Sequence, residues 1–279
     1  MCASELTLPI DAVSACSYLS YLKDSEASCG AVKVAYNAMK WAHNFVPGLS
    51  QYNDPLDEKV VKRVYESALR SIRPSRNIKA PLTKEIIDTI FRNLSRNDSL
   101  KECRDALIVA LAFALLLRHD EISHLCCSHI EWVGQNVKVL VPSSKTDCLR
   151  NGKVMWLASG RTSQLQKRYM ALAKMSPGQN RFLFGAMFSV GGAESIANEK
   201  LAYNTYRHIL KQILERQGVD ASIFGFHSCR SGGATELAQS ATTFELMTAG
   251  RWKDQRSLAH YVEVPVSRRI QLSNLLDND

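Results

Sequence analysis

The chain carries its most informative residues in Gly225-Phe-His-Ser-Cys-Arg-Ser-Gly-Gly-Ala-Thr235, followed by Ala249-Gly-Arg-Trp-Lys-Asp254 and Ala259-His-Tyr-Val262. His227 and Arg230 stand three positions apart and would lie side by side on a helical turn. The two glycines that follow permit a close approach of the backbone. Trp252 adds an indole N–H donor and Tyr261 a phenol, although either residue alone is more typical of a core. These side chains together indicate a site that handles phosphate.

Two further side chains of this kind lie upstream. Arg118 ends an apolar run in Leu115-Leu-Leu-Arg-His-Asp-Glu-Ile122, and a buried guanidinium requires an anion. Glu121 would lie on the same face of a continued helix and brace Arg118, so an internal ion pair without a ligand is the alternative. Lys145 is expected at the tip of a hairpin loop, where its ammonium either donates a proton to a substrate oxygen or is simply solvated.

Apolar periodicity divides the chain into a helical part and a mixed part. Helices are predicted in the first part at residues 12–23, 30–45 and 55–72. A polar, proline-bearing stretch follows and indicates an interdomain linker, with Thr83 capping the next helix. The second part is predicted to be mostly helical with a small sheet. Its predicted elements are a buried helix at 103–117, a β-hairpin at 137–141 and 154–157, and helices at 163–174, 202–217, 233–239 and 244–249.

The third predicted helix and the linker are strongly basic. The apolar residues of this helix share one face and its basic residues lie elsewhere, as expected of a helix that packs on one side and follows phosphates on the other. A solvated surface helix is the alternative. The candidate DNA-binding residues are Lys59, Lys62, Arg63, Arg70, Arg73, Arg76 and Lys79.

Composition excludes several classes of protein. The 35 Lys and Arg against 27 Asp and Glu give a formal charge of +8, which favours polyanionic partners such as nucleic acid. No run reaches the roughly 18 apolar residues that a membrane span requires. Acidic Glu5 and Asp11 do not fit a secretory signal, so an intracellular protein is expected.

The eight cysteines form no CxxC pair and are expected to be reduced thiols. His124, Cys126, Cys127 and His129 form the one constellation that suggests zinc. Adjacent cysteines rarely both reach one tetrahedral ion, so buried thiols are the preferred interpretation and no metal is predicted.

The order Arg118, Lys145, His227-x-x-Arg230, Trp252 and Tyr261 resembles the tyrosine recombinase (phage integrase) family. The most specific part is the C-terminal third, where Tyr261 follows Trp252 by nine residues. Ser143-Ser-Lys-Thr-Asp147 matches the lysine turn of that family. Leu115-Leu116-Leu117 departs from it, because family members usually have Thr-Gly-Leu or a similar small-residue turn before the first catalytic arginine.

The resemblance implies a mainly α fold with a small antiparallel β-sheet, arranged as a two-domain C-shaped clamp. Residues 1–78 would form a helical DNA-binding (core-binding) domain, residues 79–82 a linker, and residues 83–279 a mixed α/β catalytic domain. The implied partners are double-stranded DNA and further copies of the chain in a tetrameric synapse on DNA, with no membrane. No cofactor is implied, because the arginines supply the positive charge that Mg²⁺ supplies elsewhere. The expected compartment is the cytoplasm or nucleoid of a prokaryote or the nucleus of a eukaryote.

The resemblance also implies a role for each side chain. Tyr261 would be the nucleophile that forms a covalent 3′-phosphotyrosine and releases a 5′-hydroxyl. Arg118 and Arg230 would stabilise charge on the non-bridging oxygens. The other implied roles are protonation of the leaving 5′-oxygen for Lys145, general base or phosphate donor for His227, a hydrogen bond to phosphate for Trp252, and orientation of the first arginine for Glu121.

Two other functions stay open. One is a domesticated DNA-binding protein of the same fold that no longer cuts DNA, which the altered turn before Arg118 motivates. The other is a type IB topoisomerase-like enzyme that relaxes supercoils as a monomer. The tail after Tyr261 predicts a short helix in Ile270-Gln-Leu-Ser-Asn-Leu-Leu276, which would dock either in cis or on a neighbouring protomer.

Overall fold

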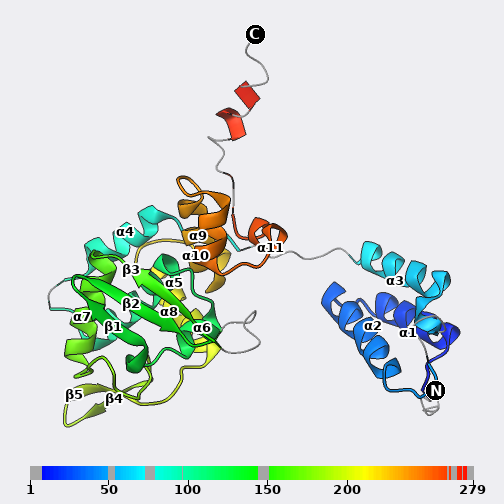
Figure 1. The fold of residues 1–279 in the computed structure, drawn as a ribbon, viewed down its shortest axis with the longest axis horizontal. Coiled ribbons are helices and arrows are strands. Elements are labelled where there is room, and N and C mark those ends of the chain that lie inside the picture. Colours follow the sequence, from blue (N-terminus) through cyan, green and yellow to red (C-terminus); the bar gives the residue numbers. More distant parts are fainter. Residues whose placement is uncertain are drawn as a thin grey trace. The chain divides into compact units, whose positions relative to one another are not determined.

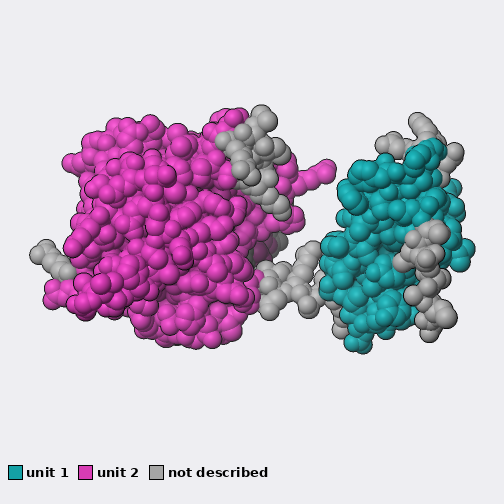
Figure 2. Space-filling model, turned by 90° about the horizontal axis from the view of Figure 1, so that it is seen from below, with its two compact units in different colours: residues 1–77 teal, residues 78–279 magenta. Residues whose placement is uncertain are grey.

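The structure is a computed structural model, and it describes residues 8–49, 54–72, 79–95, 97–143, 151–262, 264, 269–271 and 273–274. Contacts between Cα atoms divide the chain into two compact units, Met1–Asn77 and Ile78–Asp279 (Figure 2). Three predicted site residues, Arg73, Arg76 and Lys145, lie outside the described residues.

Helices form the first unit and share a small apolar core. α1 (Ala12–Asp24) and α2 (Cys29–His43) occupy the first two predicted helical segments. The side chains of Asp11 and Ser28 accept backbone N–H bonds at the two N-termini, as capping residues do. The buried core residues are Ala15, Leu19, Val32, Met39, Leu56, Val61 and Ala68.

The predicted helix at 55–72 is interrupted near its start, so the prediction was wrong there. Pro55–Asp57 form a separate 3-10 turn, η1, which the side chain of Asp54 caps. Glu58 then takes an extended backbone conformation, and α3 (Lys59–Ser71) begins after it. Pro55 does occupy a first helical position, but it is the first position of the short turn.

The second unit is built around α5 (Leu100–Ala114), which is buried along nearly its whole length, as predicted. Ser99 and Glu102 form a capping box at its start. α7 (Arg161–Leu172), α8 (Tyr203–Glu215) and α9 (His227–Leu237) all contact it. The sequence of α5 is therefore apolar on all sides because neighbouring helices cover it on several of them.

A three-stranded antiparallel sheet in the order β1-β2-β3 packs on this core. The sequence predicted the hairpin of the last two strands but not the first. Alternate residues of the middle strand, including Val137 and Val139, are fully buried, as the two-residue period of a half-buried strand requires. The strands are β1 (Ile130–Val133), β2 (Asn136–Val141) and β3 (Lys153–Leu157), and a second sheet contains β4 (Met187–Val190) and β5 (Ala193–Ile196).

The described part of the chain thus confirms a mainly helical fold with small antiparallel sheets. In Figure 1, α9, α10 and α11 gather at the end of the second unit that lies away from the β4–β5 hairpin. None of the helices within the described ranges is both long and apolar enough to cross a bilayer. The remaining elements are α4 (Lys84–Asn93), α6 (His119–Ser123), η2 (Cys127–His129), η3 (Ala221–Ile223), α10 (Thr243–Gly250) and α11 (Gln255–Ala259).

Two glycines let α9 approach its neighbours closely. A Cβ atom on Gly232 would lie 1.9 Å from the carbonyl oxygen of Leu82, and one on Gly233 would lie 2.2 Å from that of Phe113. α9 begins at His227, six residues before the predicted start, so both glycines lie inside the helix. The prediction failed because glycine disfavours a helix, whereas the contact with the backbone of α5 requires it.

α5 ends three residues earlier than predicted, in a turn with an unusual backbone. Ala114 is its last residue, and Leu116 adopts a left-handed conformation with φ of 50°. This conformation disfavours side chains with a Cβ atom by about 1–2 kcal/mol. Leu116 stands where the family that this sequence resembles usually has glycine. The backbone at this position therefore has a conformation typical of glycine, although the residue is leucine.

Candidate active site

Arg118 and Glu121 form an ion pair at the start of α6. Arg118 is the N-cap residue of this helix. The backbone N–H of Arg118 donates to one oxygen of the Glu121 carboxylate, and Nη1 of its guanidinium donates to the other, both at 2.8 Å. The Glu121 side chain is 1% exposed and that of Arg118 is 16% exposed. The internal ion pair therefore forms, and Arg118 still reaches the surface.

Positive charge surrounds the Glu121 carboxylate. Its Oε2 accepts from Nη2 of Arg251 at 2.7 Å and lies 3.9 Å from Nη1 of Arg230. Burial opposes ionisation of Glu121, but the guanidinium groups of Arg251 and Arg118 outweigh it and hold its pKa below the usual value. One carboxylate thus faces three arginines, and the cluster keeps a net positive charge that an anion can compensate.

The backbone holds Arg230 in a fully buried position. Its two terminal nitrogens donate to the carbonyl oxygens of Leu116 and Gly250. Its guanidinium carbon lies 4.4 Å from the centroid of the Trp252 ring and 5.0 Å from that of the Tyr261 ring. These distances are typical of cation–π contacts. The left-handed turn at Leu116 is therefore part of what fixes the second predicted catalytic arginine.

Three donors in this cluster have no hydrogen-bond partner within the described part of the chain. They are Nε of Arg230, Nε of Arg251 and Nε1 of Trp252, and all three atoms are buried. A buried donor without a partner is costly, so its persistence in a charged cluster favours an external acceptor. Burial and the guanidinium groups of Arg118 and Arg251 lower the pKa of Arg230. A bound anion would reverse that effect, because it stabilises the charged form.

Three rings meet beside these donors. The Tyr261 ring centroid lies 4.9 Å from that of His227 and 5.1 Å from that of Trp252. Tyr261 follows His260, the C-cap residue of α11, and its backbone N–H donates to the carbonyl of Leu258 at 2.8 Å. Gly250 makes room for the indole, since a Cβ atom there would lie 1.7 Å from the Trp252 ring. The start of α9 and the segment after α11 thereby bring imidazole and phenol together.

The environment of His227 favours its neutral form. Partial burial lowers the pKa of His227 most, and the guanidinium groups of Arg230 and Arg118 lower it further, while the Glu121 carboxylate raises it. The net effect lowers the pKa of His227 below its usual value of 6.5. The residue remains exposed on one side, so the imidazole is accessible as a proton acceptor at neutral pH.

The structure brings six of the predicted site residues into one cluster within the second unit, and most of the predicted basic residues belong to the first unit. Lys59 and Arg63 are exposed on α3. Lys62 pairs with Asp57 at 2.9 Å, and Arg70 pairs with Glu66 at 3.5 Å. Lys79 belongs to the second unit, where its ammonium donates to the carbonyl of Ser222 at 2.7 Å. The clustered residues are Arg118, Glu121, His227, Arg230, Trp252 and Tyr261.

Sequence reasoning missed Arg251. It stands beside Trp252 in the quoted stretch but was given no role there, whereas its side chain is 6% exposed and contacts Glu121. The left-handed backbone of Arg251, with φ of 58° at the end of α10, turns the side chain inward. A buried arginine next to a site that already needs positive charge is not signalled by composition or periodicity.

The cysteine and histidine residues between α6 and β1 serve structural roles. The backbone N–H of Cys126 donates to Nδ1 of His129 at 3.1 Å. Burial raises the pKa of the Cys127 thiol to about 11, so it stays protonated. Among the residues that the structure describes, no three His, Cys, Asp or Glu side chains converge as metal ligands would.

Both the sequence and the fold are similar to those of known proteins. The profile of the phage integrase family matches residues 81–268. The chain is 23% identical over 262 residues to an integrase/recombinase xerD homolog from Selenomonas ruminantium, covering 92% of this chain and 74% of that protein. The fold is similar to that of the Tn1549 transposon integrase in complex with transposon right end DNA, with a TM-score of 0.61, 13% identity and coverage of 96% of this chain and 86% of that one.

Two further solved structures show the same fold. A lambda integrase dimer bound to a COC′ core site aligns with a TM-score of 0.58 and 13% identity, over 94% of this chain and 83% of that one. The XerH site-specific recombinase bound to palindromic difH substrate aligns with a TM-score of 0.56 and 15% identity, over 88% and 70%. The family profile spans well over half of the residues, and so this chain belongs to the phage integrase family, the tyrosine recombinases, which cleave and rejoin DNA strands.

Proposed function

We propose that this chain is a site-specific recombinase in which Tyr261 attacks a DNA phosphodiester. The bond between the phenol oxygen and phosphorus forms as the bond from phosphorus to the 5′-oxygen breaks, which leaves a 3′-phosphotyrosine and a 5′-hydroxyl. The same bond exchange in reverse rejoins strands without a nucleotide cofactor. The observation that carries the proposal is the position of the Tyr261 ring, 5.0 Å from the guanidinium carbon of Arg230 and 4.9 Å from the His227 ring.

In this proposal the cationic donors bind the phosphate under attack. Charge develops on the non-bridging oxygens in the transition state, and fixed donors aimed at them lower the barrier. Nε of Arg230 and Nε1 of Trp252 are suited to this task, because neither has a partner among the described residues. Arg118 adds a partly exposed guanidinium that Glu121 orients through its 2.8 Å contact.

Proton transfer is assigned to two residues. His227, with its lowered pKa and its ring beside Tyr261, would take the phenol proton or donate a hydrogen bond to the phosphate. Lys145 would give a proton to the leaving 5′-oxygen. It belongs to the connection between β2 and β3, whose position lies outside the described residues.

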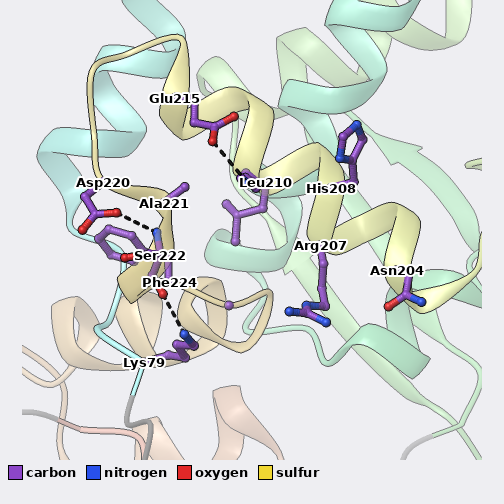
Figure 3. Close-up of a pocket in the computed structure, with 12 residues that line it drawn as sticks. Lys79, Asn204, Arg207, His208, Leu210, Glu215, Asp220, Ala221, Ser222 and Phe224 are labelled. Carbon is purple, nitrogen blue, oxygen red and sulfur yellow. Dashed lines mark hydrogen bonds and ion pairs between the residues drawn. The ribbon is translucent and has the colours of Figure 1, made fainter.

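A basic groove beside the site supports DNA as the ligand. The groove has a volume of about 470 Å³ and is lined by Lys79, Arg207, His208 and Lys211, and also by the acidic Glu215 and Asp220 (Figure 3). Phosphate contacts by such basic groups supply sequence-independent affinity for nucleic acid. Two of its lining residues, Phe224 and Gly225, come shortly before His227 in the sequence.

An aromatic cluster connects α8 with both halves of the site. The ring of His119, next to Arg118, lies 4.8 Å from the Tyr203 ring and 5.1 Å from the Tyr206 ring. It also lies 6.4 Å from the ring of Phe226, the residue before His227. A duplex seated on α8 would therefore contact a helix that packs directly against the catalytic elements.

The proposal includes DNA binding by the first unit and assembly of several copies on DNA. Residues 1–78 would act as the core-binding domain, with the exposed basic residues of α3 along the phosphates. Several copies in a synapse would allow strands from two sites to be exchanged. The lambda integrase dimer bound to its core site supports such an assembly by analogy of fold. We assign the activity to the compartment that holds the cellular DNA.

A suicide substrate tests the proposal. DNA flanking the coding region is made with a nick that frees a short fragment after cleavage, so that the covalent complex cannot be resealed. The wild-type protein should give a covalent adduct on a denaturing gel, and Tyr261→Phe should give none. Tyr18→Phe, an exposed tyrosine in the first unit, is the matched control.

Two outcomes would favour the other functions. Salt-sensitive DNA binding by the wild-type protein without an adduct on any of these DNAs would indicate a binding protein that no longer cuts. Relaxation of supercoils by single molecules, with no need for paired sites, would indicate topoisomerase-like activity.

A further inference from the structure

Arg251 contacts three segments of the second unit. Its guanidinium donates to the carbonyl oxygens of Leu115 and Leu116 at 3.2 and 2.8 Å and to the carboxylate of Glu121 at 2.7 Å. It also lies 3.3 Å from the sulfur of Met155 on β3. The residue thus spans the end of α10, the turn between α5 and α6, and the sheet.

Arg251 and Arg230 compete for the same two acceptors. Both donate to the carbonyl oxygen of Leu116. Oε2 of Glu121 accepts from Arg251 at 2.7 Å and lies 3.9 Å from Nη1 of Arg230, within ion-pair distance but beyond hydrogen-bond distance. Arg251 therefore hydrogen-bonds to the carboxylate oxygen that also faces Arg230.

We propose that Arg251 is a positioning residue that keeps Glu121 from hydrogen-bonding to Arg230, so that the charge of Arg230 remains available to the scissile phosphate. This inference rests on the proposed function. A buried carboxylate in direct contact with Arg230 would neutralise the guanidinium on which transition-state stabilisation depends. With Arg251 and Arg118 both bound to Glu121, the carboxylate is satisfied without Arg230.

Arg251 also stabilises the turn from which Arg118 starts. Its bonds to the carbonyls of Leu115 and Leu116 hold a backbone that is left-handed at Leu116 and disfavours a leucine. A neutral side chain at position 251 would lose both effects, the support of the turn and the occupation of Glu121. The two effects can be separated by removing the charge of Glu121.

The decisive test is a double-mutant cycle on single-turnover cleavage of the suicide substrate. Arg251→Ala should slow cleavage roughly 10- to 100-fold while the dissociation constant for DNA changes by less than about 3-fold, because the lost interaction acts in the transition state. Glu121→Gln alone should slow cleavage because it weakens the orientation of Arg118, but Arg251→Ala should cost much less in the Glu121→Gln background than in the wild type, because a neutral amide cannot neutralise Arg230. Arg251→Lys should retain most of the rate, since it keeps a cation beside Glu121.

A merely structural arginine would show no such coupling in this cycle. In that case Arg251→Ala would slow cleavage by the same factor with Glu121 and with Glu121→Gln, and the inference would be overturned. If Arg251→Ala melts below the assay temperature, Arg251→Gln and its combination with Glu121→Gln replace it in the cycle. Arg256→Ala, which removes an exposed guanidinium from α11, should leave the rate unchanged.

The inference and the proposed function fail in different ways. Absence of an adduct with the wild-type protein, or its persistence in Tyr261→Phe, contradicts the proposed function. An adduct that depends on Tyr261 but forms at the wild-type rate in Arg251→Ala contradicts only the role of Arg251.

Discussion

The guanidinium of Arg230 stacks on the indole of Trp252, with 4.4 Å between its central carbon and the ring centroid. The same guanidinium donates to the carbonyls of Leu116 and Gly250, so both its plane and its edge are fixed before any substrate binds. This pre-organisation matters because electrostatic stabilisation of a transition state is strongest when the donors need not move. The remaining Nε donor of Arg230 has no partner in the described structure.

Replacing Arg230 by lysine should abolish most of the activity. A lysine cannot reach two carbonyl oxygens and a phosphate with one planar group, although it keeps the positive charge. We expect a loss of roughly 100- to 1,000-fold in the single-turnover cleavage rate, with DNA affinity nearly unchanged. A loss of less than about 3-fold would show that charge alone suffices and that the stacked geometry is irrelevant.

Substitutions at Leu116 should reverse the usual order of glycine and alanine. Leu116→Ala loses buried contacts and keeps a Cβ atom in the left-handed conformation, whereas Leu116→Gly loses the contacts and relieves the strain. Both variants should be less stable than the wild type by roughly 2–5 kcal/mol, the range for truncating a buried leucine. Leu116→Gly should be the more stable of the two by about 1 kcal/mol. Chemical denaturation measures both differences, and a more stable alanine variant would disprove the strain.

Two glycine-to-alanine substitutions should have opposite effects on stability. In α9, Gly233→Ala places a Cβ atom 2.2 Å from the carbonyl oxygen of Phe113, so α9 must shift and the second unit should lose roughly 1–3 kcal/mol. In α2, Gly30→Ala meets only the Ser28 hydroxyl at 3.6 Å and should stabilise the first unit by about 0.5–1 kcal/mol. Thermal unfolding followed by calorimetry would detect both changes. Equal effects of the two substitutions would rule out the close contact of α9 with α5.

The cleavage rate should fall at acidic pH because of His227. Its pKa in the folded protein is lowered below 6.5, so the imidazole is neutral at pH 7 and gains a proton only at lower pH. A neutral imidazole is needed to accept the Tyr261 proton, so the rate should decline with an apparent pKa below 6.5. Folding stability should change in the same direction, because below pH 6.5 the unfolded chain binds more protons at this position than the folded one. His227→Gln should remove this acidic limb of the rate profile, and an unchanged limb would assign it to another group.

The order of the site residues along the chain could be predicted from the sequence, because each lies in a short stretch that has a characteristic neighbour or spacing. His227 and Arg230 share a helical turn, and the spacing between Trp252 and Tyr261 carries over from the family. Their convergence could not be derived from periodicity. It depends on glycine contacts such as that of Gly233 with the backbone of α5, which only the packed structure reveals.

Local conformation was least predictable where tertiary contacts override propensity. The apolar run through Leu117 favoured a continuous helix, but the turn at Leu116 ends it so that Arg118 can cap α6. The role of Arg251 was not predicted for the same reason, since nothing in the sequence near it indicates that its guanidinium would be buried against Glu121. In both places, hydrogen bonds from arginine side chains to carbonyl oxygens of segments that are distant in the sequence determine the local conformation.

Mapping the covalent adduct is the most direct test of the central claim that one phosphorus atom meets the side chains of Arg118, His227, Arg230, Trp252 and Tyr261. The trapped complex is digested with protease and nuclease, and the modified peptide is sequenced by mass spectrometry. We predict a nucleotide joined through its 3′-phosphate to the phenol oxygen of Tyr261. A nucleotide attached to any other residue, or joined through its 5′-phosphate, would contradict the account.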